Sequence, residues 1–205
     1  MTPHEPTEAQ RVLLDPAGPA FQAVPPDTFH ARFETTKGNV VMQVIREWSP
    51  GGAQRFYNLA RNGYYDGNRF FRVLPGFVVQ FGIHGAPAVQ RAWDGANIMD
   101  DPVRTSNARG TVAFATAGPN TRATQLFVNF GDNGQLDGMG FSPIGRIVEG
   151  MDVLERLYAG YGEMDRTGPR SQCMDSSGNA YLEQEFPQLD GIVRVSILEP
   201  PTEAR

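Results

Sequence analysis

The chain has 205 residues, a net charge of −5 and a pI near 5.2, and it contains 23 glycines, 16 prolines and one cysteine. This length suffices for one domain whose core needs no disulfide or metal, and the many turn-forming residues favour a β-rich fold over a helical bundle. The acidic balance excludes nucleic acid and an anionic membrane surface as expected partners, and no apolar run is long enough to span a bilayer. Because Cys173 has no second cysteine to pair with, we expect a passive free thiol.

The first segment, residues 1–29, is rich in proline and is expected to be an extended arm that lies on the domain through Val12, Leu13, Leu14 and Phe21. Its start lacks the basic residues and the apolar centre of a signal peptide, which taken literally indicates a cytoplasmic protein. An acidic, proline-rich start also remains after a signal segment has been removed, and the protein would then be periplasmic or secreted. The compartment therefore stays open.

The domain proper is expected to span residues 30–205. Residues 31–45 predict two strands joined by a turn at residues 37–39. Ser49 then stands before Pro50, where a capping hydroxyl precedes a first-turn proline, and apolar residues recur at helical spacing until residues 62–63. We therefore expect one amphipathic helix that covers an opening of the sheet.

Residues 68–82, NRFFRVLPGFVVQFG, predict two strands that meet at a Pro-Gly turn. Alternate residues of a strand share a face, so we expect Phe70, Arg72 and Leu74 to point one way and Gln80 to return along the same side. The result is an apolar wall that carries one cation and one amide. A single arginine in a strand most often reaches solvent at an exposed edge, so this stretch alone leaves both interpretations open.

The remaining chain predicts further strands and one more helix. Residues 83–110 show no clear period and predict an ordered surface loop anchored by Trp93. The predicted strands are residues 111–116, 125–130, 141–148 and 192–198, and the second predicted helix is residues 151–158. A polar insertion covers residues 161–190, with a short helix around Tyr181 to Phe186. We find no internal repeat and no second core, so one domain with an arm and an insertion is expected.

Three ordered motifs carry a resemblance to a known family. The wording FFRVLPGFVVQFG at residues 70–82 resembles the signature of cyclophilin-type peptidyl-prolyl cis-trans isomerases, and GPNTRATQLF at residues 118–127 is similar to a second family motif. Leu-Asp-Gly at residues 136–138 leads into GRIVEGMDVL at residues 145–154, which is also the family's wording. Motifs in this order rarely arise together by chance. The resemblance covers residues 33–157, with a weaker tail to residue 198, and its pattern is similar to the bacterial branch.

The resemblance implies a mainly β fold, a closed antiparallel cyclophilin-like barrel of about eight strands. Two α-helices cap this barrel, with the extended N-terminal arm and the C-terminal insertion loop added to it. The implied activity is peptidyl-prolyl cis-trans isomerisation, rotation about Xaa-Pro bonds in polypeptides, which assists protein folding. Proline-containing polypeptides are the expected partners of a monomer, with no nucleic acid, no membrane insertion, no metal and no cofactor.

The resemblance also assigns roles to single residues. Arg72 is expected to be catalytic through a hydrogen bond to the prolyl nitrogen, and Gln80 to act with it. The expected substrate-binding residues are Phe77, Val78, Ala115, Thr116, Gln125, Phe127, Leu136 and Phe141. Rotation about the peptide bond is slow because resonance delocalises the nitrogen lone pair, with a barrier of about 18 to 20 kcal/mol. A fixed donor aimed at that nitrogen weakens the resonance, and a guanidinium keeps its charge and direction in an apolar wall.

Some of these residues have ordinary structural explanations. Phe77 and Phe127 are also what a plain core needs, and Gln80 and Gln125 are also what satisfied buried amides look like in a β-barrel. Without the family resemblance, these explanations would be preferred.

The sequence also departs from the family pattern. Thr116 replaces a frequent asparagine, Gln135 stands where eukaryotic members have a tryptophan, and Phe141 takes the place of a pocket histidine. The change at Gln135 puts cyclosporin binding in doubt. These changes and the long insertion keep a second hypothesis open, a catalytically weak proline-peptide binding or scaffolding module. Arg72 favours the enzyme, because a binding module needs no donor at the prolyl nitrogen.

Overall fold

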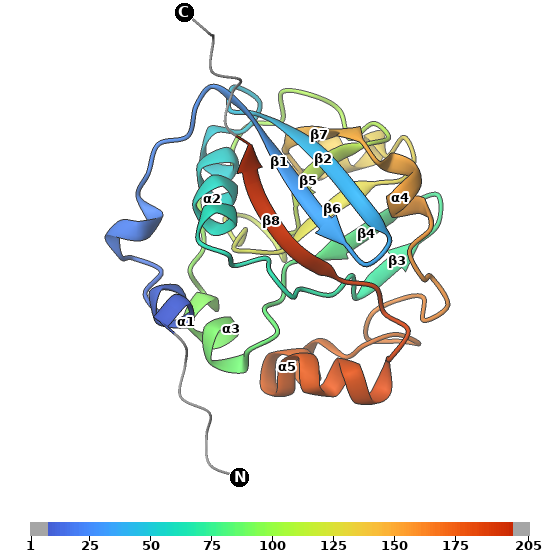
Figure 1. Ribbon diagram of the computed structural model, residues 1–205. Coiled ribbons are helices and arrows are strands. Elements are labelled where there is room, and N and C mark those ends of the chain that lie inside the picture. Colours follow the sequence, from blue (N-terminus) through green and yellow to red (C-terminus); the bar gives the residue numbers. More distant parts are fainter. Residues whose placement is uncertain (1–7, 199–205) are drawn as a thin grey trace, which may run out of the picture.

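The structure, a computed structural model, describes residues 8–198. Eight strands form one antiparallel sheet in the order β3-β4-β6-β5-β7-β2-β1-β8 (Figure 1). The strands are β1 (Thr28–Thr35), β2 (Gly38–Ile45), β3 (Arg72–Leu74), β4 (Val78–Phe81), β5 (Thr111–Phe114), β6 (Leu126–Asn129), β7 (Pro143–Glu149) and β8 (Ile192–Leu198). The helices are α1 (Glu8–Leu13), α2 (Pro50–Arg61), α3 (Pro87–Trp93), α4 (Met151–Glu155) and α5 (Ser171–Glu185), with 3-10 helices η1 (Pro19–Phe21) and η2 (Gly134–Met139).

The two ends of the sheet are joined by backbone pairing just outside strands β3 and β8. Arg69 and Gly191 form an antiparallel β-bridge, and the N–H of Ile192 donates to the carbonyl of Asn68 at 2.8 Å. A sheet whose ends meet leaves its edge groups paired. The predicted antiparallel β-barrel is therefore confirmed.

The interior of the barrel holds the main core. Met42 and Val44 of β2 are fully buried, and the ring of Phe33 in β1 meets that of Phe81 in β4 edge to face at 5.8 Å. Helices α2 and α4 lie against different parts of the barrel (Figure 1). Phe56 of α2 and the apolar side chains Val153 and Leu154 of α4 are buried. Burying each large side chain contributes about 1.5 to 3 kcal/mol. These are the two predicted capping helices.

The start of α2 is capped differently from the prediction. The hydroxyl of Ser49 makes no bond to the first turn and donates instead to Asp101 Oδ2 at 2.6 Å. The carboxylate of Asp101 accepts from the backbone N–H groups of Gly51 (3.2 Å) and Gly52 (2.9 Å). Arg122, buried beneath the helix, donates to the same carboxylate at 3.1 Å. A distant acidic residue therefore takes the role expected of Ser49.

The N-terminal segment is not simply extended. Residues 1–7 of the expected arm lie outside the described residues, but α1 and η1 give the following part regular structure. Leu13 and Phe21 are buried: Trp93 Nε1 donates to the carbonyl of Leu13 at 2.8 Å, and its ring meets that of Phe21 at 4.8 Å. Val12 and Leu14, also expected to anchor the segment, are exposed. The division into arm and domain stays a prediction.

Two segments expected to be mainly loop contain helices, α3 and α5, which contact each other on one side of the barrel (Figure 1). Helix α5 replaces the short helix expected around residues 181–186, and it bends at Gly178, whose φ is 58°. Its side chains Met174 and Leu182 pack on Phe71 in a small second cluster with Ile83 and Leu189. This cluster lies apart from the main core, and the single domain with an insertion stays a prediction. No helix within residues 8–198 combines the length and apolar character needed to cross a membrane.

Candidate active site

Strands β3 and β4 form a hairpin that places Arg72 directly opposite Gln80. Val79 and Phe81 point into the barrel core, whereas Arg72 and Gln80 lie on the outer side. The expectation that Phe70 shares the face of Arg72 is wrong: Phe70 packs in the core against Phe81, with ring centroids 5.7 Å apart. Phe70 precedes β3, so the alternation of the strand does not extend to it.

An apolar cluster, which we call the outer cluster, lies beside this hairpin. Its four buried members are Val78, Ala113, Phe127 and Leu136, and the half-buried Phe77, Ala115 and Phe141 pack against them. The rings of Phe127 and Phe141 meet edge to face at 5.5 Å. All the apolar residues predicted to bind substrate therefore lie together, although they come from four separate parts of the chain.

Hydrogen bonds join three of the predicted polar residues, Arg72, Gln80 and Gln125, in a line. Arg72 Nη1 donates to Gln80 Oε1 at 3.2 Å, and Gln80 Nε2 donates to Gln125 Oε1 at 2.9 Å. The guanidinium carbon of Arg72 lies 5.7 Å from the centre of the Phe77 ring. The side chain of Arg72 is 19% exposed, so the cation stands at the border between the outer cluster and solvent. This arrangement holds a charged donor beside an apolar surface.

The predicted residues omit one member of this line, Glu163. Its carboxylate accepts from Arg72 Nε at 2.5 Å and from Arg72 Nη2 at 3.0 Å. The hydrogen bond from Arg72, with its positive charge, lowers the pKa of the Glu163 carboxyl below its ordinary value. Glu163 lies in the polar insertion, 91 residues after Arg72, and no motif in that segment distinguishes it.

A pocket of about 460 Å³ adjoins the two amides. Ala115, Thr116, Gln80 and Gln125 line it, together with Met164. The N–H of Ala115 is already bonded to the carbonyl of Gln125 at 2.9 Å. The pocket therefore lies beside the two amides, between the residues that follow β5 and those that precede β6.

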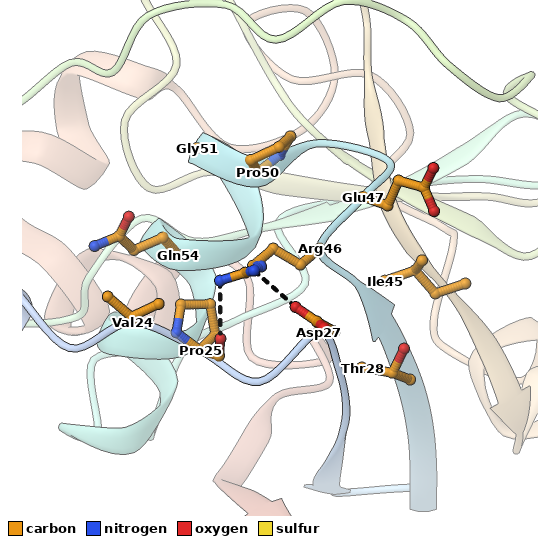
Figure 2. Close-up of a pocket in the computed structure, with 10 residues that line it drawn as sticks. All are labelled: Val24, Pro25, Asp27, Thr28, Ile45, Arg46, Glu47, Pro50, Gly51 and Gln54. Atoms are coloured by element: carbon orange, nitrogen blue, oxygen red, sulfur yellow. Dashed lines mark hydrogen bonds and ion pairs between the residues drawn. The ribbon is translucent and has the colours of Figure 1, made fainter.

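A second pocket, of about 560 Å³, lies apart from these residues, between the end of the N-terminal segment, β2 and the first turn of α2 (Figure 2). Arg46 crosses it, 2.7 Å from Asp27 and 3.5 Å from the carbonyl of Pro25. None of the residues predicted for catalysis or substrate binding lines this pocket. Its wall is partly apolar, and the Arg46–Asp27 pair lies within it.

The fold and the candidate site together form a closed antiparallel barrel whose outer side carries a held arginine, two amides and an apolar cluster. The family model described as cyclophilin type peptidyl-prolyl cis-trans isomerase/CLD matches residues 30–174. The chain therefore belongs to the cyclophilin-type peptidyl-prolyl cis-trans isomerases, and the predicted family and enzyme class are confirmed.

Individual relatives agree with this assignment. The chain is 33% identical over 135 residues to peptidyl-prolyl cis-trans isomerase ppi1 of Schizosaccharomyces pombe, a match that covers 62% of this chain and 84% of the relative. It is 32% identical over 146 residues to peptidyl-prolyl cis-trans isomerase A of Dickeya dadantii, covering 68% and 75%. A crystal structure of a cyclophilin type peptidyl-prolyl cis-trans isomerase from Cryptosporidium parvum shares the fold, with a TM-score of 0.63, 20% identity and coverage of 85% and 99%.

Proposed function

We propose that this isomerase accelerates rotation about Xaa-Pro bonds by directing an N–H of Arg72 at the prolyl nitrogen while the outer cluster holds the proline ring. The observation that carries the proposal is the fixed guanidinium of Arg72 at the edge of that cluster. Nη1 and Nη2 each carry a second hydrogen beyond the one donated to Gln80 or Glu163. These hydrogens are the donors we assign to the substrate.

The physical reason is the electronic structure of the amide. A hydrogen bond to the nitrogen localises its lone pair, so the carbon–nitrogen bond loses double-bond character and its barrier of about 18 to 20 kcal/mol falls. Each reduction of about 1.36 kcal/mol gives a tenfold faster rotation. The apolar cluster strengthens this effect, since water is excluded from one side of the donor.

The remaining residues are proposed to bind and orient the peptide. Phe77, Phe127, Leu136 and Phe141, with Val78 beneath them, supply the apolar contact that a proline ring needs. Gln80 and Gln125 orient the substrate carbonyl through their amides, and the backbone near Ala115 and Thr116 holds the peptide in an extended form. We further propose that the protein acts as a monomer on proline-containing polypeptides and thereby assists their folding, with no part for nucleic acid.

The experiment that tests the proposal is NMR exchange spectroscopy on a short Xaa-Pro peptide with catalytic amounts of protein. Wild type should accelerate cis-trans exchange, and Arg72→Ala should lose at least about tenfold of that rate while still binding the peptide. Arg69→Ala is the matched control, because Arg69 is a neighbouring arginine that pairs with Glu183 away from the outer cluster. It should keep the wild-type rate.

Two results would contradict the proposal. Equal rates for wild type and Arg72→Ala would remove Arg72 from the mechanism. Peptide binding by wild type without any acceleration would favour the proline-peptide binding or scaffolding module, and the departures at Gln135 and Phe141 would then be the first places to examine.

A further inference from the structure

We propose that Glu163 is a positioning residue for Arg72: its carboxylate fixes the guanidinium in the orientation that isomerisation requires. The inference rests on the proposed role of Arg72. It assigns a function in the reaction to the segment that follows Tyr161, which sequence motifs leave without one.

The contact between the two side chains is bidentate. Glu163 takes the Nε and Nη2 edge of Arg72, and Gln80 takes a hydrogen of Nη1. Paired N–H···O bonds between a guanidinium and a carboxylate fix direction as well as distance. Since Glu163 and Gln80 bind different nitrogens of Arg72, the guanidinium cannot rotate without breaking at least one of these hydrogen bonds.

The backbone of Glu163 is itself held in a tight turn. Its carbonyl oxygen accepts hydrogen bonds from the N–H groups of Thr167 (3.1 Å) and Gly168 (2.9 Å). Gly162, directly before it, has a φ of 67°, a left-handed conformation that glycine adopts without a steric cost. The carboxylate is therefore presented to Arg72 from a closed turn, which reduces the entropy lost when the ion pair forms.

Aromatic contacts and helix α5 anchor the turn on both sides. Tyr161 packs edge to face against Tyr158 at 5.0 Å and against Phe186 at 4.9 Å. Asp165 accepts from the backbone N–H of Ser171 at 2.8 Å, which ties the turn to the start of α5. Through α5 the same segment packs on Phe71, the residue next to Arg72. The support for Glu163 and the support for Arg72 are thus one packed unit.

The turn also reaches the substrate side of the site. Met164, the next residue after Glu163, lines the pocket beside Gln80 and Gln125. If the segment only stabilised the fold, two consecutive residues would not need to bind Arg72 and to line this pocket. The turn is therefore a wall of the site as well as a support for Arg72.

The expected effect is moderate, because the Glu163 side chain is 37% exposed and water screens the pair. Replacing it with glutamine keeps the size of the side chain but removes the charge and one acceptor oxygen. We expect kcat of Glu163→Gln to fall about five- to tenfold while KM changes less than about twofold, since the lost interaction orients the donor rather than binding the substrate.

The experiment compares wild type, Glu163→Gln, Arg72→Ala and the control Glu183→Gln in the same exchange assay. Glu183 also belongs to the polar insertion and also pairs with an arginine, Arg69, but away from the outer cluster. The Arg72 Nε–H resonance is followed in parallel in ¹⁵N-labelled protein. In wild type and in Glu183→Gln it should be shifted downfield and protected from exchange with water, and in Glu163→Gln it should lose both properties.

Each outcome decides the inference. A fall in kcat together with loss of the protected Nε–H signal supports it. A rate equal to wild type, with Arg72→Ala inactive, overturns it and leaves the proposed function standing. A rate above wild type also overturns it, because the carboxylate would then be masking Arg72. Absence of acceleration by wild type would refute the proposed function itself, and the inference would fall with it.

Discussion

Gln80 of β4 donates from Nε2 to Oε1 of Gln125, the residue directly before β6, at 2.9 Å, which fixes the relative orientation of the two amides. The Oε1 atom of Gln80 accepts a hydrogen bond from Arg72 at the same time, so the amide oxygen is directed at Arg72 and the amide nitrogen at Gln125. A buried amide whose donor and acceptor are both used has a single preferred orientation. Gln80 is therefore the link between the arginine and the pocket beside Gln125.

The first prediction concerns this link. Gln80→Met keeps the approximate volume but removes both hydrogen bonds, so Arg72 Nη1 loses its acceptor. We expect kcat/KM to fall about tenfold, with a loss of about 1 kcal/mol in the free energy of unfolding. Peptide-exchange rates and urea titrations measure the two effects. Gln43→Met, in which the replaced amide bonds only the exposed Arg146, should leave the rate unchanged.

A second prediction separates substrate binding from stability. Phe127→Leu removes part of the ring that packs against Phe141 in the outer cluster. We expect the peptide dissociation constant to rise about tenfold and the free energy of unfolding to fall by about 1 to 2 kcal/mol. Phe29→Leu is the control, because Phe29 is a similarly buried phenylalanine of the main core. A similar rise in the dissociation constant for Phe29→Leu would show that general destabilisation, not the pocket, causes the effect.

The third prediction concerns Asp101, which caps α2 and pairs with the 1%-exposed Arg122. Asp101→Asn leaves a buried cation without its closest carboxylate, so the free energy of unfolding should fall by about 3 kcal/mol. Asp100→Asn is the control, since the Asp100 carboxylate is more exposed and its loss should cost less than about 1 kcal/mol. Denaturant titrations compare the two variants. Equal losses would contradict the central place given to Asp101.

The same carboxylate gives an acid dependence. Burial by itself would raise the pKa of Asp101, but hydrogen bonds from Ser49, Gly52 and Gly51, together with the charge of Arg122, lower it below its ordinary 3.8. Because the pKa is lower in the folded state, the stabilisation is fully present above pH 3.8 and is lost as the pH falls through the lower, folded value. In Asp101→Asn this part of the acid denaturation should be absent.

The fourth prediction is a loss of stability between pH 6.5 and pH 4. Burial lowers the pKa of His84 from 6.5 to about 4. The backbone N–H of Ala86 donates a hydrogen bond to Nδ1 of this imidazole at 3.0 Å. Below pH 6.5 the imidazole of His84 is protonated in the unfolded chain but stays neutral in the folded protein. Stability therefore falls as the pH falls toward 4, by up to about 3 kcal/mol. Thermal unfolding across this range measures the slope.

The matching variants are His84→Asn, whose side-chain oxygen can accept from Ala86, and His30→Asn on β1. In His84→Asn, stability should depend less on pH between pH 6.5 and pH 4. In His30→Asn, the loss of stability that His84 causes in this range should remain. An unchanged slope in His84→Asn would assign the acid sensitivity to another group.

The sequence predicted those parts of the molecule that local patterns determine. The hairpin of β3 and β4 follows from its alternating apolar residues and its Pro-Gly turn, and the strands that follow show the same period. The grouping of Phe127 and Leu136 with Phe77 came from the family resemblance, because alternation alone does not say which strands become neighbours.

The unpredicted features depend on contacts between distant residues. The bond between Glu163 and Arg72 spans 91 residues, and that between Ser49 and Asp101 spans 52. A polar side chain carries no local sign of such a partner. Helix α5 escaped prediction for a different reason: the backbone of Gly178 leaves helical geometry in its middle, so the apolar residues on either side do not share one period.

The closure of the barrel between Asn68 and Ile192 sets an order on biosynthesis. The segment that leads into Arg72 emerges from the ribosome early, but its partner across the closure is made more than a hundred residues later. Until that stretch has left the exit tunnel, residues 68 and 69, which lead into β3, lack their backbone partners at residues 191 and 192. A ribosome-bound chain that ends before β8 is therefore expected to be without isomerase activity.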